Sequence, residues 1–311
     1  MKRVHLMILA ILAAAAVAVA QAPQSQAKPQ TPPPQKQEAQ SAQPAPAPLP
    51  KNVLMAKTKE EFQAYNEASG KADSSAAEAA ASDFAAKFPD SNLRAYLYQR
   101  VMALYQNAGN DEKALEVGRK ALQIQPDNPV ALVGVANVLA NRTRDSDLDR
   151  DEKLAEATKD ATRALETVDT DLPIPPNTPP ERVDTYKNLL RSMSYASLGL
   201  VQLHKKDFAA AEGYLRKSVE ADKMQPDPVT RLQLAFALDK LGKYQEALGV
   251  AQECLQIPNN PVADRCRMEQ DRLKKLVEAA APAAKPSEAP AAPSSAPAPA
   301  PKPQNPPPPG R

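Results

Sequence analysis

An alanine recurs along the middle of the chain at intervals that strongly limit its architecture. Taking Ala77, Ala114, Ala157, Ala211 and Ala247 as equivalent points gives spacings of 37, 43, 54 and 36 residues. Each spacing equals a unit of 34 residues plus an insertion of 3, 9, 20 or 2 residues. Self-similarity at such a period is typical of stacked units that cannot bury their apolar faces alone. The spacing therefore predicts an array of repeats.

The repeated segment has the chemistry of helices. Apolar residues recur with helical spacing, and no stretch shows the sustained alternation of a strand. Thr58 with Glu61 indicates a capping box, and a proline ends the helical run "KALEVGRKALQIQPDNP". The two longest insertions are "TRDSDLDRDEK" at 143–153 and "VDTDLPIPPNTPPER" at 168–182, and both are expected to be loops.

Several units resemble the tetratricopeptide repeat (TPR), a helical hairpin of 34 residues. The matching residues are Tyr98, Val101, Tyr105, Gly109, Ala114, Ala121 and Pro126 in the second unit, Tyr195, Leu198, Gly199, Phe208, Ala211 and Leu215 in the fourth, and Leu234, Ala235, Gly242, Tyr244, Ala247 and Pro258 in the fifth. The resemblance covers about residues 56–260. It implies an all-α fold, an α-solenoid of about five TPR-like hairpins, and the charged segment 261–280 suits a C-terminal capping helix.

The two ends of the chain have a different composition. Residues 22–50 and 281–311 hold 21 of the 33 prolines and are otherwise mostly Ala, Gln, Lys and Ser. Such segments bury too little apolar surface to offset the loss of chain entropy on folding. We expect disordered Pro/Ala-rich tails at 21–51 and 281–311, on either side of a repeat domain at 52–280.

The first twenty residues predict export. Lys2 and Arg3 precede an apolar run, and Ala18-Val19-Ala20 matches a signal-peptidase site. We expect a signal peptide at 1–20, cleavage before Gln21, and a periplasmic or secreted protein without a membrane span. An uncleaved N-terminal anchor is the alternative. The run is short for a transmembrane helix.

The acidic stretch from Asp145 to Glu156 has two interpretations. Asp145, Asp147, Asp149 and Glu156 stand at oxygen-ligand places of a calcium loop, but Arg150 replaces the glycine that its sharp turn needs. The alternative is a loop between two helices, whose acids favour the positive end of the second helix. We favour the second interpretation and predict no metal site.

The two cysteines, Cys254 and Cys266, stand twelve residues apart with a turn between them. That spacing suits a disulfide across adjacent helices, which export permits. Two free thiols are the alternative.

Composition and motifs argue against several classes of function. The charged residues balance at 39 Lys and Arg against 37 Asp and Glu, without the basic excess of nucleic-acid binders. No catalytic or cofactor-binding motif occurs, and we expect a solvated or satisfied side chain at His204. The sequence predicts neither an enzyme nor a cofactor, and no small-molecule substrate is evident.

The resemblance implies a ligand surface on the concave side, formed by the first helix of each hairpin. The predicted contact residues are Tyr96, Gln99, Asn137, Asn141, Leu200 and Phe236. For each of them, plain packing or solvation is the alternative. We therefore expect a non-enzymatic scaffold or adaptor of the cell envelope that binds a protein or peptide. The competing hypothesis is a structural spacer whose Pro-rich tails carry the interactions.

Overall fold

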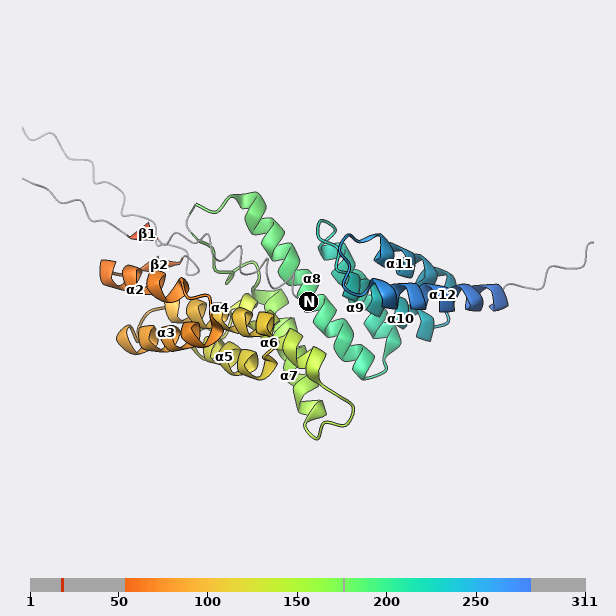
Figure 1. Cartoon of the computed structure of the whole chain (residues 1–311), viewed down its shortest axis with the longest axis horizontal. Helices are drawn as coiled ribbons and strands as arrows, with labels where there is room; N and C mark the ends of the chain where they lie inside the picture. Colours follow the sequence, from red (N-terminus) through yellow and green to blue (C-terminus); the bar gives the residue numbers. More distant parts are fainter. Residues whose placement is uncertain (1–17, 20–53, 176, 281–311) are drawn as a thin grey trace, which may run out of the picture.

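The computed structural model describes residues 18–19, 54–175 and 177–280 of the chain. Within these residues it is an elongated array of helical hairpins that runs from α2 at one end to α12 at the other (Figure 1). The hairpins are α2 (Lys59–Ser69) with α3 (Ser74–Lys87), α4 (Leu93–Ala108) with α5 (Asp111–Ile124), α6 (Pro129–Arg142) with α7 (Arg150–Thr167), α8 (Pro180–His204) with α9 (Phe208–Ala221), and α10 (Pro228–Lys240) with α11 (Tyr244–Gln256). The last helix, α12 (Ala263–Ala280), follows them. This confirms the predicted all-α solenoid of five hairpins and a final helix.

Each recurring alanine lies in the second helix of its hairpin, at a fully buried position. Ala114, Ala157, Ala211 and Ala247 have no exposed surface, and Ala77 has almost none. A methyl group is the whole side chain there, so the two helix backbones of a hairpin can approach closely. The alanines of the 34-residue period therefore mark where the two helices of each hairpin are in close contact.

The helix ends follow local chemistry. Thr58 Oγ1 accepts a hydrogen bond from the Glu61 backbone N–H at 3.1 Å at the start of α2, as the capping motif predicts. Asn128 caps α6 and Asp227 caps α10, in each case just before a proline in the first turn. Proline suits that position because its missing N–H would have no partner there.

Both long insertions are partly helical, contrary to expectation, since α7 begins at Arg150 within 143–153. The loop prediction for 168–182 holds only up to Pro179, because α8 begins at Pro180 and runs for 25 residues. The first helices of the second, third and fifth hairpins are shorter, with 16, 14 and 13 residues. The insertion also buries Val168 and Leu172, which pack in one apolar cluster with Tyr186 and Leu190 of α8. Burial of these side chains anchors the segment against the third hairpin.

A short parallel pair of two-residue strands, β1 (Ala18–Val19) and β2 (Met55–Ala56), lies beside α2. The remainder of the predicted signal peptide, both Pro-rich tails and Ala20 at the cleavage site lie outside the residues that the structure describes. Export and cleavage remain predictions. No helix among the described residues combines the length and apolar character needed to cross a membrane.

The final helix closes the array. Leu273 of α12 is fully buried in the apolar cluster of the last two hairpins, and most of the rest of the helix is polar and exposed. Arg272 holds α12 to α10 through an ion pair with Asp239 at 2.8 Å. One apolar face and one charged face are what the end of a stacked array requires.

The close packing of the fourth hairpin sets a test. A β-carbon on Gly199 of α8 would lie 2.7 Å from Leu215 Cγ of α9, whereas one on Gly213 would meet nothing within 4 Å. We expect Gly199→Ala to lower the free energy of unfolding by about 1–3 kcal/mol through overpacking. Gly213→Ala should raise it by about 0.5–1 kcal/mol through lower backbone entropy of the unfolded chain. Urea denaturation measures both, and equal effects would contradict the packing described.

A buried carboxyl in the third hairpin makes stability depend on pH. Burial of Asp160 in α7, together with the nearby charge of Glu156, raises its pKa from 3.8 to about 6, although Lys159 and Arg119 oppose this. The folded state therefore binds its proton more tightly than the unfolded chain, so this group lowers stability as pH rises from about 4 to 6.

Asp160→Asn should remove this loss. We expect the variant to match the natural chain near pH 4 and to be more stable by about 1–2 kcal/mol above pH 6, since the amide cannot ionise. Thermal or urea unfolding across that range measures the difference. A constant difference at all pH values would exclude this explanation.

Candidate functional site

A hollow lies where the first helices meet the turns that lead into them. This first hollow has a volume of about 650 Å³. Its walls come from α6, α8 and α10, from the turn between α9 and α10, and from the turn between α11 and α12. A second hollow of about 420 Å³ lies between α10, α12 and the end of α8. Gln233 lines both hollows, and together we call them the groove.

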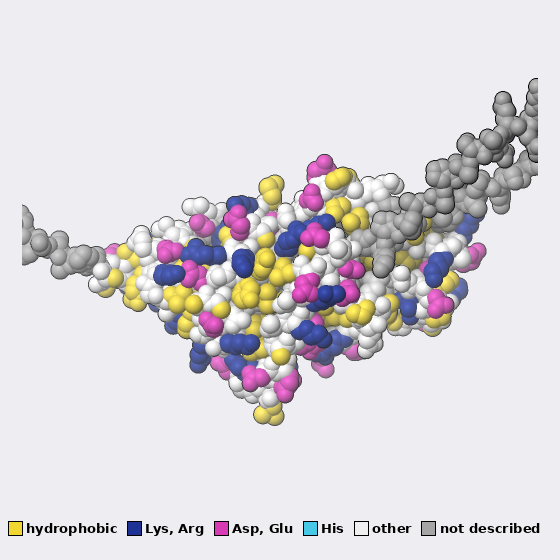
Figure 2. Space-filling view, turned by 180° about the vertical axis from the view of Figure 1, so that it is seen from behind, with side chains coloured by type: hydrophobic (Ala, Val, Ile, Leu, Met, Phe, Trp, Pro, Cys, Tyr) yellow, Lys and Arg dark blue, Asp and Glu magenta, His cyan; other side chains and the backbone are white. Residues whose placement is uncertain are grey.

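The walls of the first hollow are mainly apolar. Leu189, Met193 and Leu200 of α8 face Val229 of α10 and Ile257 of the last turn across it. Figure 2 shows hydrophobic side chains gathered near the middle of one face of the array, with charged side chains around them. Apolar walls exclude water, so a bound segment would gain free energy by burying its own apolar surface.

Four amide side chains interrupt this apolar lining. Asn137, Gln225, Gln233 and Asn259 line the first hollow, and none of these side chains forms a hydrogen bond within the part of the chain that the structure describes. Asn141 differs, because its amide donates to the Asn137 carbonyl at 2.8 Å. The hollow thus offers donors and acceptors at positions suited to the backbone of a peptide.

The charge in the first hollow is negative. Asp222 and Asp227 line it, and no Lys or Arg does. Asp227 accepts hydrogen bonds from the backbone N–H groups of Val229 and Thr230 at 3.2 and 3.0 Å. Burial raises the pKa of Asp222, while the Gln225 backbone N–H, 3.1 Å from its carboxylate, acts in the opposite direction.

The second hollow presents an aromatic ring. Phe236 of α10 is 40% exposed and meets Phe208 edge to face, with 6.2 Å between ring centroids. The Lys240 ammonium lies 5.1 Å from the centre of the Phe236 ring. Leu203, Leu232 and Met268 complete the apolar lining of this hollow. An exposed ring held in place by its neighbours is a suitable anchor for an apolar side chain of a partner.

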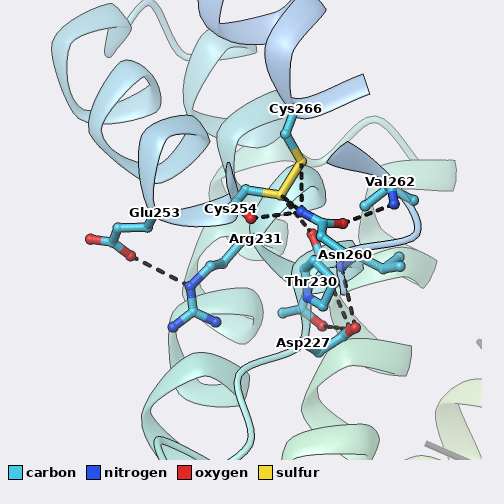
Figure 3. Close-up of a disulfide and its surroundings, with 10 residues drawn as sticks. Asp227, Thr230, Arg231, Glu253, Cys254, Asn260, Val262 and Cys266 are labelled. Carbon is cyan, nitrogen blue, oxygen red and sulfur yellow. Dashed lines mark hydrogen bonds and ion pairs between the residues drawn. A yellow bond between two sulfur atoms is a disulfide. The ribbon is translucent and has the colours of Figure 1, made fainter. Parts of the chain in front are cut away.

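A disulfide holds the turn that forms one wall of the groove (Figure 3). Cys254 near the end of α11 is bonded to Cys266 of α12, with 6.1 Å between the two Cα atoms. Between them the Asn260 amide donates to the Cys254 carbonyl at 2.7 Å and accepts from the Val262 N–H at 2.8 Å. The bridge and Asn260 together fix the wall formed by Ile257 to Pro261.

The structure separates the predicted contact residues into two groups. Asn137, Asn141 and Leu200 line the first hollow, and Phe236 lines the second. Tyr96 and Gln99, in contrast, are only 5% and 1% exposed, so they do not lie on an accessible face. Tyr96 packs in the core cluster of the first hairpins, and burial raises the pKa of its phenol.

Tyr96 is covered within the core of the first hairpins, and α8 covers part of the inner face of the third hairpin. α8 packs against α6 as well as against α7 and α9. Tyr186 of α8 is buried. Burial raises the pKa of its phenol, and Tyr96 adds a smaller effect in the same direction. Val133 of α6 is buried in the same cluster as Tyr186. Register alone does not show that an insertion covers the inner face of these hairpins.

The part of the groove that comes from turns was not predicted from the sequence. Residues 225–228 and 257–261 contribute prolines and amides to the first hollow. The repeated proline just before or inside a first helix marks these turns in the sequence. That signal indicated helix boundaries, and it contained nothing to show that the turns of two hairpins form one wall.

The acidic stretch forms ion pairs in several directions. Asp145 pairs with Arg150 at 3.4 Å, while Asp147 and Asp149 pair with Lys153 at 3.0 and 2.8 Å. Glu156 faces α5, where Arg119 donates two hydrogen bonds to it at 2.9 and 2.7 Å. α7 begins at Arg150 with acids in its first turn, the arrangement of a helix start. Among residues 54–175 and 177–280, no three His, Cys, Asp or Glu side chains form a set suited to a metal ion.

His204 has a structural role. Its Nε2 lies 2.9 Å from the Ala140 carbonyl, and the Arg150 guanidinium donates to the His204 carbonyl. These contacts tie the ends of α6 and α8 to the start of α7, so the imidazole is satisfied as expected.

Comparison with known proteins adds a fold-level likeness. No protein-family model and no curated protein sequence matches the chain. Among solved structures, it is similar to TTC0263, a thermophilic TPR protein of Thermus thermophilus, at 16% identity and a TM-score of 0.42, over 70% of this chain and 96% of that one. It is also similar to a chain of the Cut9-Hcn1 hetero-tetramer of APC/C, at 14% identity and a TM-score of 0.34, over 70% of this chain and 42% of that one.

The hairpins keep the spacing of the TPR pattern to which the sequence is similar. The buried alanine in each second helix and the left-handed glycines after α4 and α10, Gly109 at φ 75° and Gly242 at φ 72°, stand where the repeat pattern places them. A positive φ favours glycine because it has no β-carbon.

Removing the disulfide tests how the groove wall is held. We expect Cys254→Ser with Cys266→Ser to lower the free energy of unfolding by about 3 kcal/mol, the loop-entropy value for a short closed loop. The loss should be greatest for α12, which amide hydrogen exchange can resolve. Unchanged exchange in the turn and in α12 would show that Asn260 and packing suffice.

Proposed function

We propose that this protein is a non-enzymatic adaptor of the cell envelope that binds an extended peptide segment of another protein in the groove. The observation that supports this most directly is the first hollow, which combines apolar walls with four amides that have no hydrogen-bond partner among the described residues. An extended peptide has apolar side chains to bury and backbone groups to pair, and such a surface satisfies both needs.

The groove suggests how a peptide would lie. One part of the segment would rest against Leu200, with Asn137 and Asn141 beside it at the α6 end. It would pass Gln233, which lines both hollows, and place an apolar side chain against Phe236. The peptide would contact α6, α8, α10 and α12 in turn. Because these helices are already ordered, little conformational entropy of the protein would be lost on binding.

The rest of the molecule supports an adaptor better than a catalyst. His204 is engaged with a backbone carbonyl, and the carboxylates of the acidic stretch are paired with Lys and Arg. The envelope location comes from the N-terminal pattern of Lys2, Arg3 and the apolar run before Ala20. The repeat domain would then act in an oxidising compartment, where the bond between Cys254 and Cys266 can persist.

Peptides selected from a random library on the immobilised protein provide a probe for the groove. We expect Leu200→Asp to weaken their binding at least tenfold, because a carboxylate would replace an apolar contact in a hollow that is already acidic. Phe236→Ala should weaken the binding of those peptides that carry a large apolar side chain at one end. Fluorescence anisotropy with labelled peptides measures both dissociation constants.

The chain provides a matched control for the first change. Leu148 is fully exposed in the turn between α6 and α7 and lines neither hollow, so Leu148→Asp makes the same substitution without altering a hollow. It should leave peptide affinity unchanged, and circular dichroism should show all variants folded. Equal loss at Leu148 and Leu200, or none at either, would contradict the proposed site.

A further inference from the structure

The first hollow is matched to a particular kind of peptide. Its acids, Asp222 and Asp227, have no Lys or Arg beside them in the lining, and its free amides can donate hydrogen bonds. A proline-rich segment in the polyproline II conformation has backbone carbonyls that need donors, but few N–H groups that need acceptors. It is also extended before binding, so little conformational entropy is lost.

The chain itself contains a segment with these properties. Residues 281–311 hold 12 prolines, and three cations, Lys285, Lys302 and Arg311, against the single acid Glu288. The prolines would pack on the apolar walls, while the excess of positive charge complements the acids of the hollow. Composition and charge therefore both match this segment to the groove.

The geometry of α12 brings the segment close to the groove. The turn before α12 lines the first hollow, and Arg265 to Arg272 of α12 line the second. α12 ends at Ala280 after 18 residues, which is about 27 Å of helix. The following segment would span roughly 95 Å as polyproline II, at about 3.1 Å per residue. It can return along α12 and still leave more than half its length for binding.

The N-terminal Pro-rich segment is less suited to the same place. Residues 21–51 precede β2 and α2, which lie at the opposite end of the array from α10 and α12 (Figure 1). A tethered segment binds in proportion to its effective concentration, and that concentration falls as the distance to be spanned grows. The tail that follows α12 therefore has the advantage.

We infer that residues 281–311 occupy the first hollow of their own chain and compete there with a partner peptide. This inference rests on the proposed function of the groove. A flexible tether gives an effective concentration of about 1 mM, so a tail with an intrinsic dissociation constant near 0.1 mM would fill most grooves. The apparent affinity for any other peptide would then fall about tenfold. A partner that binds more tightly displaces the tail and frees its prolines.

Photo-crosslinking in the full chain tests the occupant directly. Gln233 is replaced by the photoreactive residue benzoylphenylalanine, and Leu148 is replaced in the same way as a control at an exposed turn. After irradiation, we expect a monomeric product that joins position 233 to a peptide within 281–311, at a yield independent of protein concentration. A product with 21–51, a dimeric product, or no product from position 233 would overturn the inference.

A binding measurement gives an independent test. In one variant, residues 281–311 are replaced by a Gly/Ser segment of equal length, and a synthetic peptide with the sequence of residues 281–311 is added as the probe. We expect this variant to bind the peptide at least tenfold more tightly than the natural chain does, and Leu200→Asp to abolish that gain. Equal affinity for the two chains would overturn the inference.

The two proposals fail in distinguishable ways. If library peptides bind in a manner that depends on Leu200 but the 281–311 peptide does not bind, the groove stands and the tail is not its occupant. If neither kind of peptide depends on Leu200, the groove itself is not the working surface, and the proposed function fails with the inference.

Discussion

Close contact between two helix backbones is the constraint on which the rest of the structure depends. In each hairpin an alanine of the second helix is fully or almost fully buried, and in the fourth hairpin Gly199 lets Leu215 approach the backbone of α8. Interiors pack near crystal density, so a side chain one methyl group larger must displace its neighbours. The small residues thereby define which faces of each helix point inward, and so which faces remain for α6, α8 and α10 to form the groove.

The insertion before α8 then divides the inner surface into two parts. Its extra helical turns pack on α6, and Val133 at the start of that helix is buried with Tyr186. The first hollow begins where that cover ends, at Leu189 and Met193, and continues past Leu200 to the turns before α10 and α12. α8 also supplies one wall of the first hollow. The same helix thus covers part of the inner surface and shapes the part that stays open.

The two hollows differ in charge as well as in shape. The first is lined by acids without cations, and the second carries Arg265, and Arg272 paired with Asp239 and Glu269. This difference follows from the position of α12, whose charged face is not covered by another helix among the described residues. α12 therefore both ends the array of described helices and shapes one end of the groove. The bond between Cys254 and Cys266 holds it to α11.

The sequence by itself determined the helical class, the number of hairpins and the position of each alanine contact, because these depend on local spacing. Ala114 and Ala247 are buried where the period placed them, and Asp227 and Asn128 cap helices as their types favour. Only the tertiary structure decided which inward positions stay open. Tyr96 and Leu200 are both predicted on the inward faces of their first helices, yet Tyr96 is buried and Leu200 lines the groove. The difference comes from non-local contacts, since Tyr96 packs in the core cluster of the first hairpins, and α8 packs on α6 across an insertion whose length shows nothing about where it packs.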